Sequence, residues 1–549
     1  TGASNTAVGH ASLASNTTGQ HNTASGFESL KANTTGNVNT ASGYQALLSN
    51  TTGWGNLALG NSTLDANTTG IKNIAVGGAS LSANTTGDQN VAVGYNALLS
   101  NTTASDNTAV GDRALQTNTT GTRNTAVGKS ALLANTTGNY NVAMGYNSLD
   151  ANTTGTHNTS IGDSSMSTNT TGIKNIAVGQ GAFANNTTGN ENVAIGVDAL
   201  AANTTASENT AVGEQCLSAN TTGSGNCGLG RQALNNNTTA SNNTGMGLYA
   251  LYANTTGHSN TAVGKSALIA NTTGHSNLAA GYHALKANTT ATHGVALGHS
   301  ALILNTTGAS NTAVGNSSLY SNTTGGSNTA VGRASLEANT TGASCAAVGL
   351  NALLRNTTGE NNTAIGRNAL LNVTTGDHNT GLGTTAGDNI STGSNNTCIG
   401  YLSTTPSNSS TNTFTLGNGS TDNLRCNDTS ISSLSDERDK SNIVDIPLGV
   451  DFLNTVRPVS FDWERRDGTY AGVKDFGFIA QELKIAADAT PYADHMRLVR
   501  EENLDKLEAD PMKMFPILVK AIQELSAKND ALETQNATFA ARLTALEGE

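Results

Sequence analysis

The stretch N-T-A-V-G-K-S-A-L-L-A-N-T-T-G-N-Y, from Asn124 to Tyr140, is one copy of a 17-residue repeat that decides the fold. The repeat recurs 24 times from Asn5 to Asn396 without an insertion or deletion, and a degraded copy lies at 413–417. A strict period imposes the same backbone path on every unit. Because the unit is too short for a helical hairpin and its Thr, Val, Asn and Gly favour strands and tight turns, we predict a β-solenoid. With one turn per repeat and turns about 4.8 Å apart, the rod would be about 110 Å long.

Positions in the repeat are numbered from its first Asn, so that Asn124 stands at position 1. Position 4 is almost always branched or apolar (Val127) and position 9 is almost always Leu (Leu132), and we predict that both columns stack in the interior. Position 3 accepts only small residues such as Ala126, which indicates close packing against another wall or chain. We expect the Gly at position 5 and the Asn at positions 1 and 12 to take left-handed conformations at the corners.

Charge is distributed unevenly along the chain. Residues 435–549 hold 14 of the 27 basic and 22 of the 39 acidic residues, so the composition changes sharply at Ser435. In the repeats the charges mostly occupy the variable positions 6, 7, 10, 16 and 17, which we expect to face solvent. A net charge of −12 without a basic cluster argues against a nucleic-acid partner and against a membrane surface. The five cysteines lack a regular spacing, so we expect no metal site, no disulfide framework and no cofactor.

Neither a membrane span nor a secretion signal is visible. No stretch approaches the roughly 18 apolar residues that span a bilayer. Thr1 opens within a repeat, and we expect a further N-terminal segment before it.

The strand-and-glycine unit, as in Asn124 to Gly128 or Asn311 to Gly315, resembles the N-S-V-A-I-G repeats of trimeric autotransporter head domains of the YadA type. The resemblance covers about 400 residues and implies a trimeric, left-handed, parallel β-roll. The period here is longer than that of the family. The charged C-terminal segment also differs from the membrane-anchoring β-barrel that ends such bacterial adhesins.

Three motifs follow in order near the C-terminus: I-S-S-L-S-D-E-R-D-K-S-N-I from Ile431, R-P-V-S-F-D-W at 457–463, and F-G-F-I-A-Q-E-L at 476–483. Together they resemble the self-cleaving intramolecular chaperone domain of endosialidase tailspikes and phage tail fibres. The resemblance implies that the chain breaks between Leu434 and Ser435, with Ser435 as the nucleophile and Lys440 as its base. We expect single-turnover autoproteolysis and no turnover enzyme.

The chemistry is plausible because a Ser hydroxyl becomes a good nucleophile only when a base removes its proton, which a desolvated Lys can do. In isolation, Ser435, Asp436 and Lys440 would be read as a helix cap with solvated charges. The flanking motifs favour the catalytic interpretation.

The last helix carries a heptad pattern, which predicts a coiled-coil seam. Two of its members, Asn529 and Asn536, fall at a positions, where a buried amide fixes register and strand number. The alternative is an amphipathic helix that packs on its own domain. The seam residues are Ile522, Leu525, Asn529, Leu532, Asn536, Phe539, Leu543 and Leu546.

We therefore predict a mainly β protein with four parts: a solenoid shaft at 1–400, a distal tip or transition segment at 401–434, a small α+β chaperone domain at 435–515, and a trimeric coiled coil at 516–549. Similar repeats would let chains slip by 17 residues with little loss of contacts. A trimer that forms first at the C-terminus would set the register, and its release would trap the fibre kinetically.

The function implied by these resemblances is that of a homotrimeric phage tail fibre in the virion, outside the cell. Its partners would be its own copies, a host surface receptor such as a glycan, and other virion tail proteins reached through the preceding N-terminal segment. The sequence leaves the receptor-binding residues unknown. The alternatives are a bacterial surface adhesin or extracellular filament and, from the aligned N-T-T threonines, an ice-binding solenoid.

Overall fold

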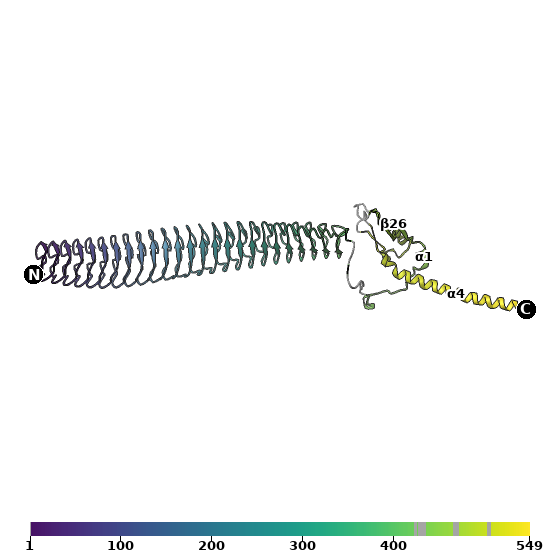
Figure 1. The fold of residues 1–549 in the computed structure, drawn as a ribbon, viewed down its shortest axis with the longest axis horizontal. Helices are drawn as coiled ribbons and strands as arrows, with labels where there is room; N and C mark the ends of the chain where they lie inside the picture. Colours follow the sequence, from purple (N-terminus) through teal and green to yellow (C-terminus); the bar gives the residue numbers. More distant parts are fainter. Residues whose placement is uncertain (1, 422–424, 426–434, 465–470, 502–506, 549) are drawn as a thin grey trace. The chain divides into compact units, whose positions relative to one another are not determined.

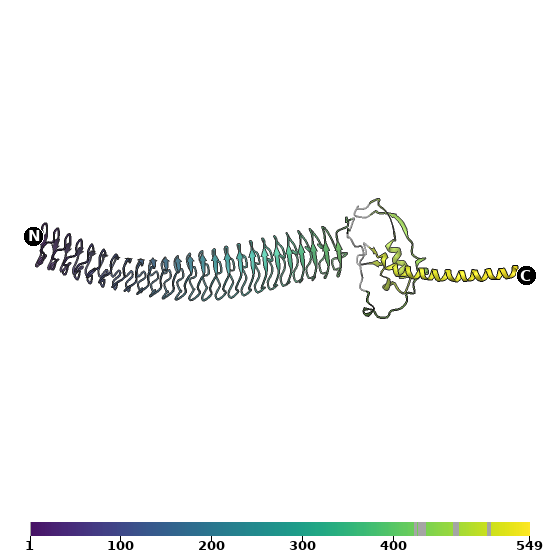
Figure 2. The same cartoon turned by 60° about the horizontal axis from the view of Figure 1, so that its bottom comes forward.

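Every 17-residue repeat forms one turn that carries a single three-residue strand. The computed structural model describes residues 2–421, 425, 435–464, 471–501 and 507–548. The chain divides into two units, Thr1–Asn368 and Ala369–Glu549, which are described separately. Figures 1 and 2 show the strands stacked side by side along the shaft.

The strands of the repeats belong to one 25-stranded sheet. In the first unit they are β1 Thr6–Val8, β2 Thr23–Ser25, β3 Thr40–Ser42, β4 Leu57–Leu59, β5 Ile74–Val76, β6 Val91–Val93, β7 Thr108–Val110, β8 Thr125–Val127, β9 Val142–Met144, β10 Thr159–Ile161, β11 Ile176–Val178, β12 Val193–Ile195, β13 Thr210–Val212, β14 Cys227–Leu229, β15 Thr244–Met246, β16 Thr261–Val263, β17 Leu278–Ala280, β18 Val295–Leu297, β19 Thr312–Val314, β20 Thr329–Val331, β21 Ala346–Val348 and β22 Thr363–Ile365. In the second unit they are β23 Thr380–Leu382, β24 Thr397–Ile399 and β25 Phe414–Leu416.

Neighbouring strands pair in parallel with a shift of one repeat. Ala126 of β8, for example, lies opposite Ala143 of β9. This register confirms the predicted β-solenoid with one turn per repeat. The degraded repeat at 413–417 also forms a rung, because Leu416 of β25 pairs with Ile399 of β24.

The Gly at position 5 ends each strand for two reasons. Gly111 has φ +137°, a conformation that side chains with a Cβ rarely adopt. A Cβ on Gly111 would also lie 2.4 Å from the carbonyl oxygen of Gly128 in the next turn. The backbones of successive turns therefore approach too closely for any other residue.

The interior column differs from the prediction. Ala126 at position 3 is completely buried, as is Leu132 at position 9, whereas the position 4 side chains point outward and Val263 is 40% exposed. Side chains alternate between the two faces of a strand, so positions 2 and 4 share the outer face when position 3 faces inward. The prediction that position 4 lies in the interior of the single chain was wrong.

The corner prediction for Asn was also wrong. Left-handed backbone occurs at positions 7, 9 and 17, as at Ser130, Leu132 and Tyr140, and not at positions 1 and 12. The Asn side chains instead bond the turns. Within one repeat, Asn124 and Asn135 both donate from Nδ2 to the carbonyl oxygen of Gly138, at 2.8 and 3.1 Å. A buried polar side chain needs hydrogen-bond partners, and these bonds supply them. They explain why Asn recurs at positions 1 and 12.

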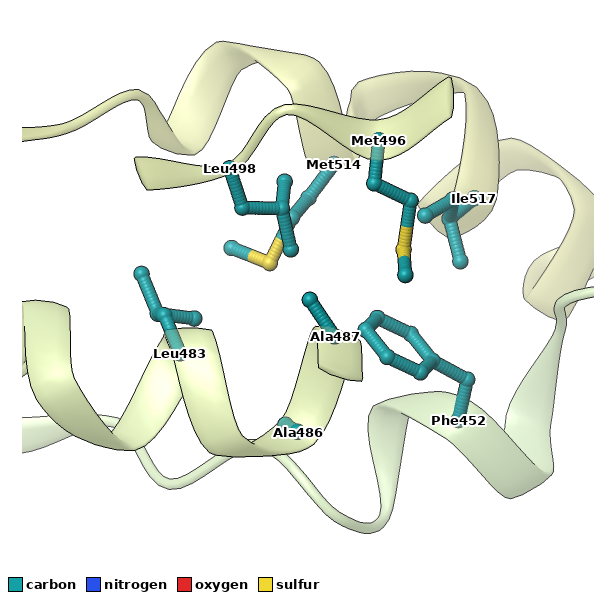
Figure 3. Packing of buried hydrophobic residues seen from close by; sticks show 8 residues of the cluster. All are labelled: Phe452, Leu483, Ala486, Ala487, Met496, Leu498, Met514 and Ile517. Atoms are coloured by element: carbon teal, nitrogen blue, oxygen red, sulfur yellow. The ribbon is translucent and has the colours of Figure 1, made fainter. Parts of the chain in front are cut away.

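The C-terminal part of the second unit is a small helix and sheet region. It contains η1 Glu437–Asp439, α1 Val450–Leu453, β26 Val459–Asp462, β27 Lys474–Gly477, α2 Ala480–Asp488, α3 Ala493–Met496, β28 Val499–Arg500, β29 Glu508–Ala509, η2 Pro511–Met514 and α4 Phe515–Glu547. Strands β26 and β27 are antiparallel, as are β28 and β29. Figure 3 shows its core, in which Phe452 of α1 and Leu483 and Ala487 of α2 pack with Met514 and Ile517.

Candidate self-cleavage site

A short 3-10 turn brings the two predicted catalytic residues together. Asp436 caps η1, because its carboxylate accepts the backbone N–H of Arg438 at 2.9 Å. At the other end the N–H of Lys440 donates to the carbonyl oxygen of Glu437 at 3.0 Å. The capped turn places the Lys440 side chain within reach of Ser435.

Lys440 Nζ lies 2.6 Å from Ser435 Oγ and 3.2 Å from the Ser435 carbonyl oxygen. This is hydrogen-bonding distance, within which a neutral amine could take the hydroxyl proton. Both residues are exposed in the single chain. Leu434, on the other side of the predicted scissile bond, lies outside the described residues.

The carboxylate of Asp436 pairs with Arg438 and not with Lys440. Arg438 Nη2 lies 2.6 Å from Asp436 Oδ2, and this hydrogen-bonded pairing lowers the pKa of the Asp436 carboxyl. The sequence analysis considered Asp436 as a helix cap but did not predict its ion pair with Arg438. The cap itself is recognisable, because Asp is a preferred residue at the start of a helix.

The other two motifs of the predicted chaperone domain contact each other. Val459 on β26 pairs with Gly477 on β27, which joins the R-P-V-S-F-D-W and F-G-F-I-A-Q-E-L segments. Arg457 Nε donates to Glu482 Oε2 of α2 at 2.9 Å, and this interaction lowers the pKa of Glu482. The motifs thus form one structural element and are not separate surface segments.

The predicted seam of α4 is exposed. Ile517 and Ala521, at the start of the helix, are buried in the core, whereas Leu525, Phe539 and Leu546 are more than half exposed. One of the predicted amides, Asn529, donates to Glu533 Oε1 at 3.2 Å on the same helix. The alternative in which the whole helix packs on its own domain is therefore not the observed arrangement.

The shaft carries a second surface with exposed apolar side chains, formed by positions 2 and 4 of the strands and called the outer strand face below. Position 4 is mostly apolar, whereas position 2 is Thr in many repeats. No repeat has a charged residue at either position. At position 4, Ile195, Leu229 and Ile365 are 38, 48 and 44% exposed. Large contiguous apolar surfaces usually mark interaction sites.

The threonines of the N-T-T corners are engaged within the solenoid. Thr119 Oγ1 donates to the carbonyl oxygen of Thr136 one turn later at 3.0 Å, and the pattern recurs along the shaft. At the first Thr of the N-T-T corners the hydroxyl is thus used in a hydrogen bond within the protein. This weakens the hypothesis that the aligned threonines form an ice-binding array.

Within the described residues there is no group of three or more His, Cys, Asp or Glu side chains arranged to hold a metal ion. His258 and His275, which align in successive rungs, stack with ring centroids 4.8 Å apart.

None of the helices in the described part of the chain has the length and apolarity needed to cross a membrane.

Residues 435–493 match the family model described as chaperone of endosialidase, Peptidase_S74. The match begins at Ser435, the residue that the sequence motifs predict to follow the scissile bond. No curated protein and no solved structure matches the chain. The chain therefore combines a β-solenoid of about 24 turns with a segment that is similar to the chaperone-of-endosialidase family.

Proposed function

We propose that this chain is the subunit of a homotrimeric bacteriophage tail fibre, which attaches the virion to a host surface. Its C-terminal region acts as an intramolecular chaperone and releases itself by cleavage between Leu434 and Ser435. The observation that best supports this proposal is the 2.6 Å hydrogen bond between Lys440 Nζ and Ser435 Oγ, at the start of the segment that matches the chaperone-of-endosialidase model.

The domain boundaries that fit this function are a shaft at 1–400, a tip at 401–434, the chaperone at 435–515 and a coiled coil at 516–549. Three copies of α4 would bury the seam that a single chain leaves exposed. Three copies of the shaft would bury the outer strand face in the same way. Because the two apolar surfaces need a partner of the same length, another copy of the chain is the simplest occupant.

Self-cleavage would follow assembly. A protonated Lys cannot accept the Ser435 proton, and desolvation is what lowers the pKa of a lysine. In the single chain Lys440 is exposed to water. Coverage of the dyad by neighbouring chains would therefore switch the reaction on only after the trimer has formed.

Cleavage is tested by expressing the wild type beside Ser435→Ala and measuring intact masses after denaturation. We expect the wild type to give a fragment that begins at Ser435, and the variant to stay whole. Ser441→Ala is the matched control, because Ser441 is exposed in the same segment and should leave cleavage unchanged. Equal cleavage of Ser435→Ala, or none in the wild type, would refute the dyad.

A bacterial surface adhesin is the second candidate, because the repeat unit resembles trimeric autotransporter heads. A virion-attachment domain encoded upstream of the shaft would support the tail fibre, whereas a secretion signal encoded there would support the adhesin.

A further inference from the structure

The middle of the shaft lacks acidic residues. From Gln215 to Leu336 the chain contains no Asp or Glu, although the protein as a whole has a net charge of −12. The same stretch contains four Lys and Arg residues and five of the ten histidines. Local charges dominate here, because charges more than about 8 Å away are screened at physiological ionic strength. This part of the shaft therefore presents a positive surface.

Within this stretch, one tyrosine ring is surrounded by cationic and titratable side chains. Lys265 Nζ lies 5.9 Å from the Tyr282 ring centroid, and the His299 ring stacks on Tyr282 at 5.2 Å. The His283 ring lies 3.8 Å from the same centroid. Lys286 is close enough for its charge to lower the pKa of His283, after the larger effect of partial burial. These five residues are called the Tyr282 cluster.

The cluster is fixed by the stacking of three rungs. The His283 N–H donates to the carbonyl oxygen of Lys265 at 3.2 Å, and the Ser300 N–H donates to the carbonyl oxygen of Tyr282 at 3.0 Å. Residues that are 17 positions apart in the sequence thus become neighbours, and their backbones are held by the solenoid.

The cluster faces solvent rather than the outer strand face. Lys265, Tyr282 and His299 stand at position 6 of their repeats, a position that also holds Asp112, Lys129 and Glu214 elsewhere in the shaft. A column with charges of both signs is unsuited to a buried contact between chains. The Tyr282 side chain is 42% exposed.

We propose that the Tyr282 cluster is a binding site for an anionic polysaccharide, with the edge and hydroxyl of the Tyr282 ring against a sugar residue and the lysines beside its acidic groups. This inference rests on the proposed role in surface attachment and specifies the receptor class. Aromatic rings with a polar edge bind partly apolar ligands such as sugars, and ammonium groups bind carboxylate or sulfate as point charges.

A nucleic acid fits the cluster less well. Single strands bind to grooves with several stacking rings and a continuous basic track. Here one tyrosine and two histidine rings stand with two lysines and no continuous basic track, which suits a single charged sugar residue. Single-stranded DNA is accordingly used as a competing ligand in the test.

The test measures binding of the full-length trimer to immobilised polygalacturonate, dextran sulfate and neutral dextran at fixed salt. We expect binding to one or both acidic polymers and none to dextran. A preference between the two identifies the acidic group as carboxylate or sulfate. Lys265→Gln/Lys286→Gln should weaken binding at least tenfold, and Tyr282→Ser should weaken it about threefold or more.

The matched control is Lys129→Gln/Lys31→Gln, which removes lysines from the same repeat positions, 6 and 10, outside the acid-free stretch. It should change binding by less than twofold. Equal losses in both double variants, no binding to either acidic polymer, or tighter binding to single-stranded DNA would overturn the inference. Cleavage at Ser435 and trimer mass, measured on the same samples, report the proposed function separately.

Discussion

The side-chain amide of Asn135 donates to Oδ1 of Asn118, one repeat earlier, at 2.9 Å. Asn135 also bonds the carbonyl oxygen of Gly138, and the next amide, Asn152, donates to Asn135 Oδ1 at 2.8 Å. All of these side chains are completely buried. The shaft therefore contains an amide ladder from Asn16 to Asn356, which ends where Val373 takes the place of the next Asn.

Asn135→Ala should destabilise the adjoining rungs by about 2–4 kcal/mol, because it leaves a buried acceptor on Asn118 without its donor. Hydrogen exchange of the backbone amides between residues 118 and 155 measures this local loss. Thr137→Ala, in the same corner but exposed, should cost less than about 0.5 kcal/mol. Equal protection in both variants would show that the ladder contributes little.

Gly111→Ala should destabilise the shaft by about 3 kcal/mol or more, since the new Cβ requires both a strained φ and a shift of the next turn. Gly78→Ala is the control, because a Cβ there meets only the Tyr95 ring, at 3.4 Å. Urea unfolding of the two variants should differ clearly. Similar midpoints would contradict the close approach of the turns.

Leu229→Asp/Met246→Asp should reduce trimer formation if the outer strand face is the contact between chains. Each trimer would then bury six carboxylates without partners, which costs several kcal/mol. Analytical ultracentrifugation of refolded protein gives the trimer fraction. Lys129→Asp/Lys265→Asp, with its changes at position 6, should assemble normally, and a comparable defect there would point to a different interface.

Asp150→Asn should stabilise the shaft at pH 7 but not at pH 3. Burial raises the pKa of the Asp150 carboxyl, and its buried Oδ1 has no hydrogen-bond partner among the residues that the structure describes. An acid with a raised folded-state pKa stabilises the fold most when protonated, below its unfolded value of about 3.9, and this contribution is lost as the pH rises through the folded pKa.

Thermal unfolding at the two pH values measures the effect. Asp163→Asn, at an exposed position, should change stability little at either pH. A stabilisation of Asp150→Asn that is the same at pH 3 and pH 7 would contradict the role of the charge.

The repeat length and the Thr, Val, Asn and Gly of the unit were enough to predict the solenoid, because 17 residues are too short for a helical hairpin and these residues favour strands and tight turns. They were not enough to predict which strand face is inside. Ala126 and Val127 are both apolar, and in a chain that assembles with copies of itself the larger residue can serve the contact between chains. An apolar residue in the sequence can therefore lie either in the interior of one chain or in a contact between chains, and its apolarity does not say which.

The functional sites were likewise predicted only in part. The pairing of Ser435 with Lys440 was expected from the motifs, and the capping by Asp436 explains it physically. The Tyr282 cluster was not predicted, because its rings stand at two different repeat positions. Only the stacking of rungs brings Tyr282, His283 and His299 into contact.

The measurement that most directly tests the central claim, that the C-terminal region sets the register of the shaft, is refolding from denaturant. Uncleaved Ser435→Ala and the separately purified 1–434 fragment are compared by trimer yield in ultracentrifugation. The account predicts that Ser435→Ala returns mostly to trimers, whereas residues 1–434 give slipped or aggregated species. Equal recovery of native trimers from the 1–434 fragment would contradict it.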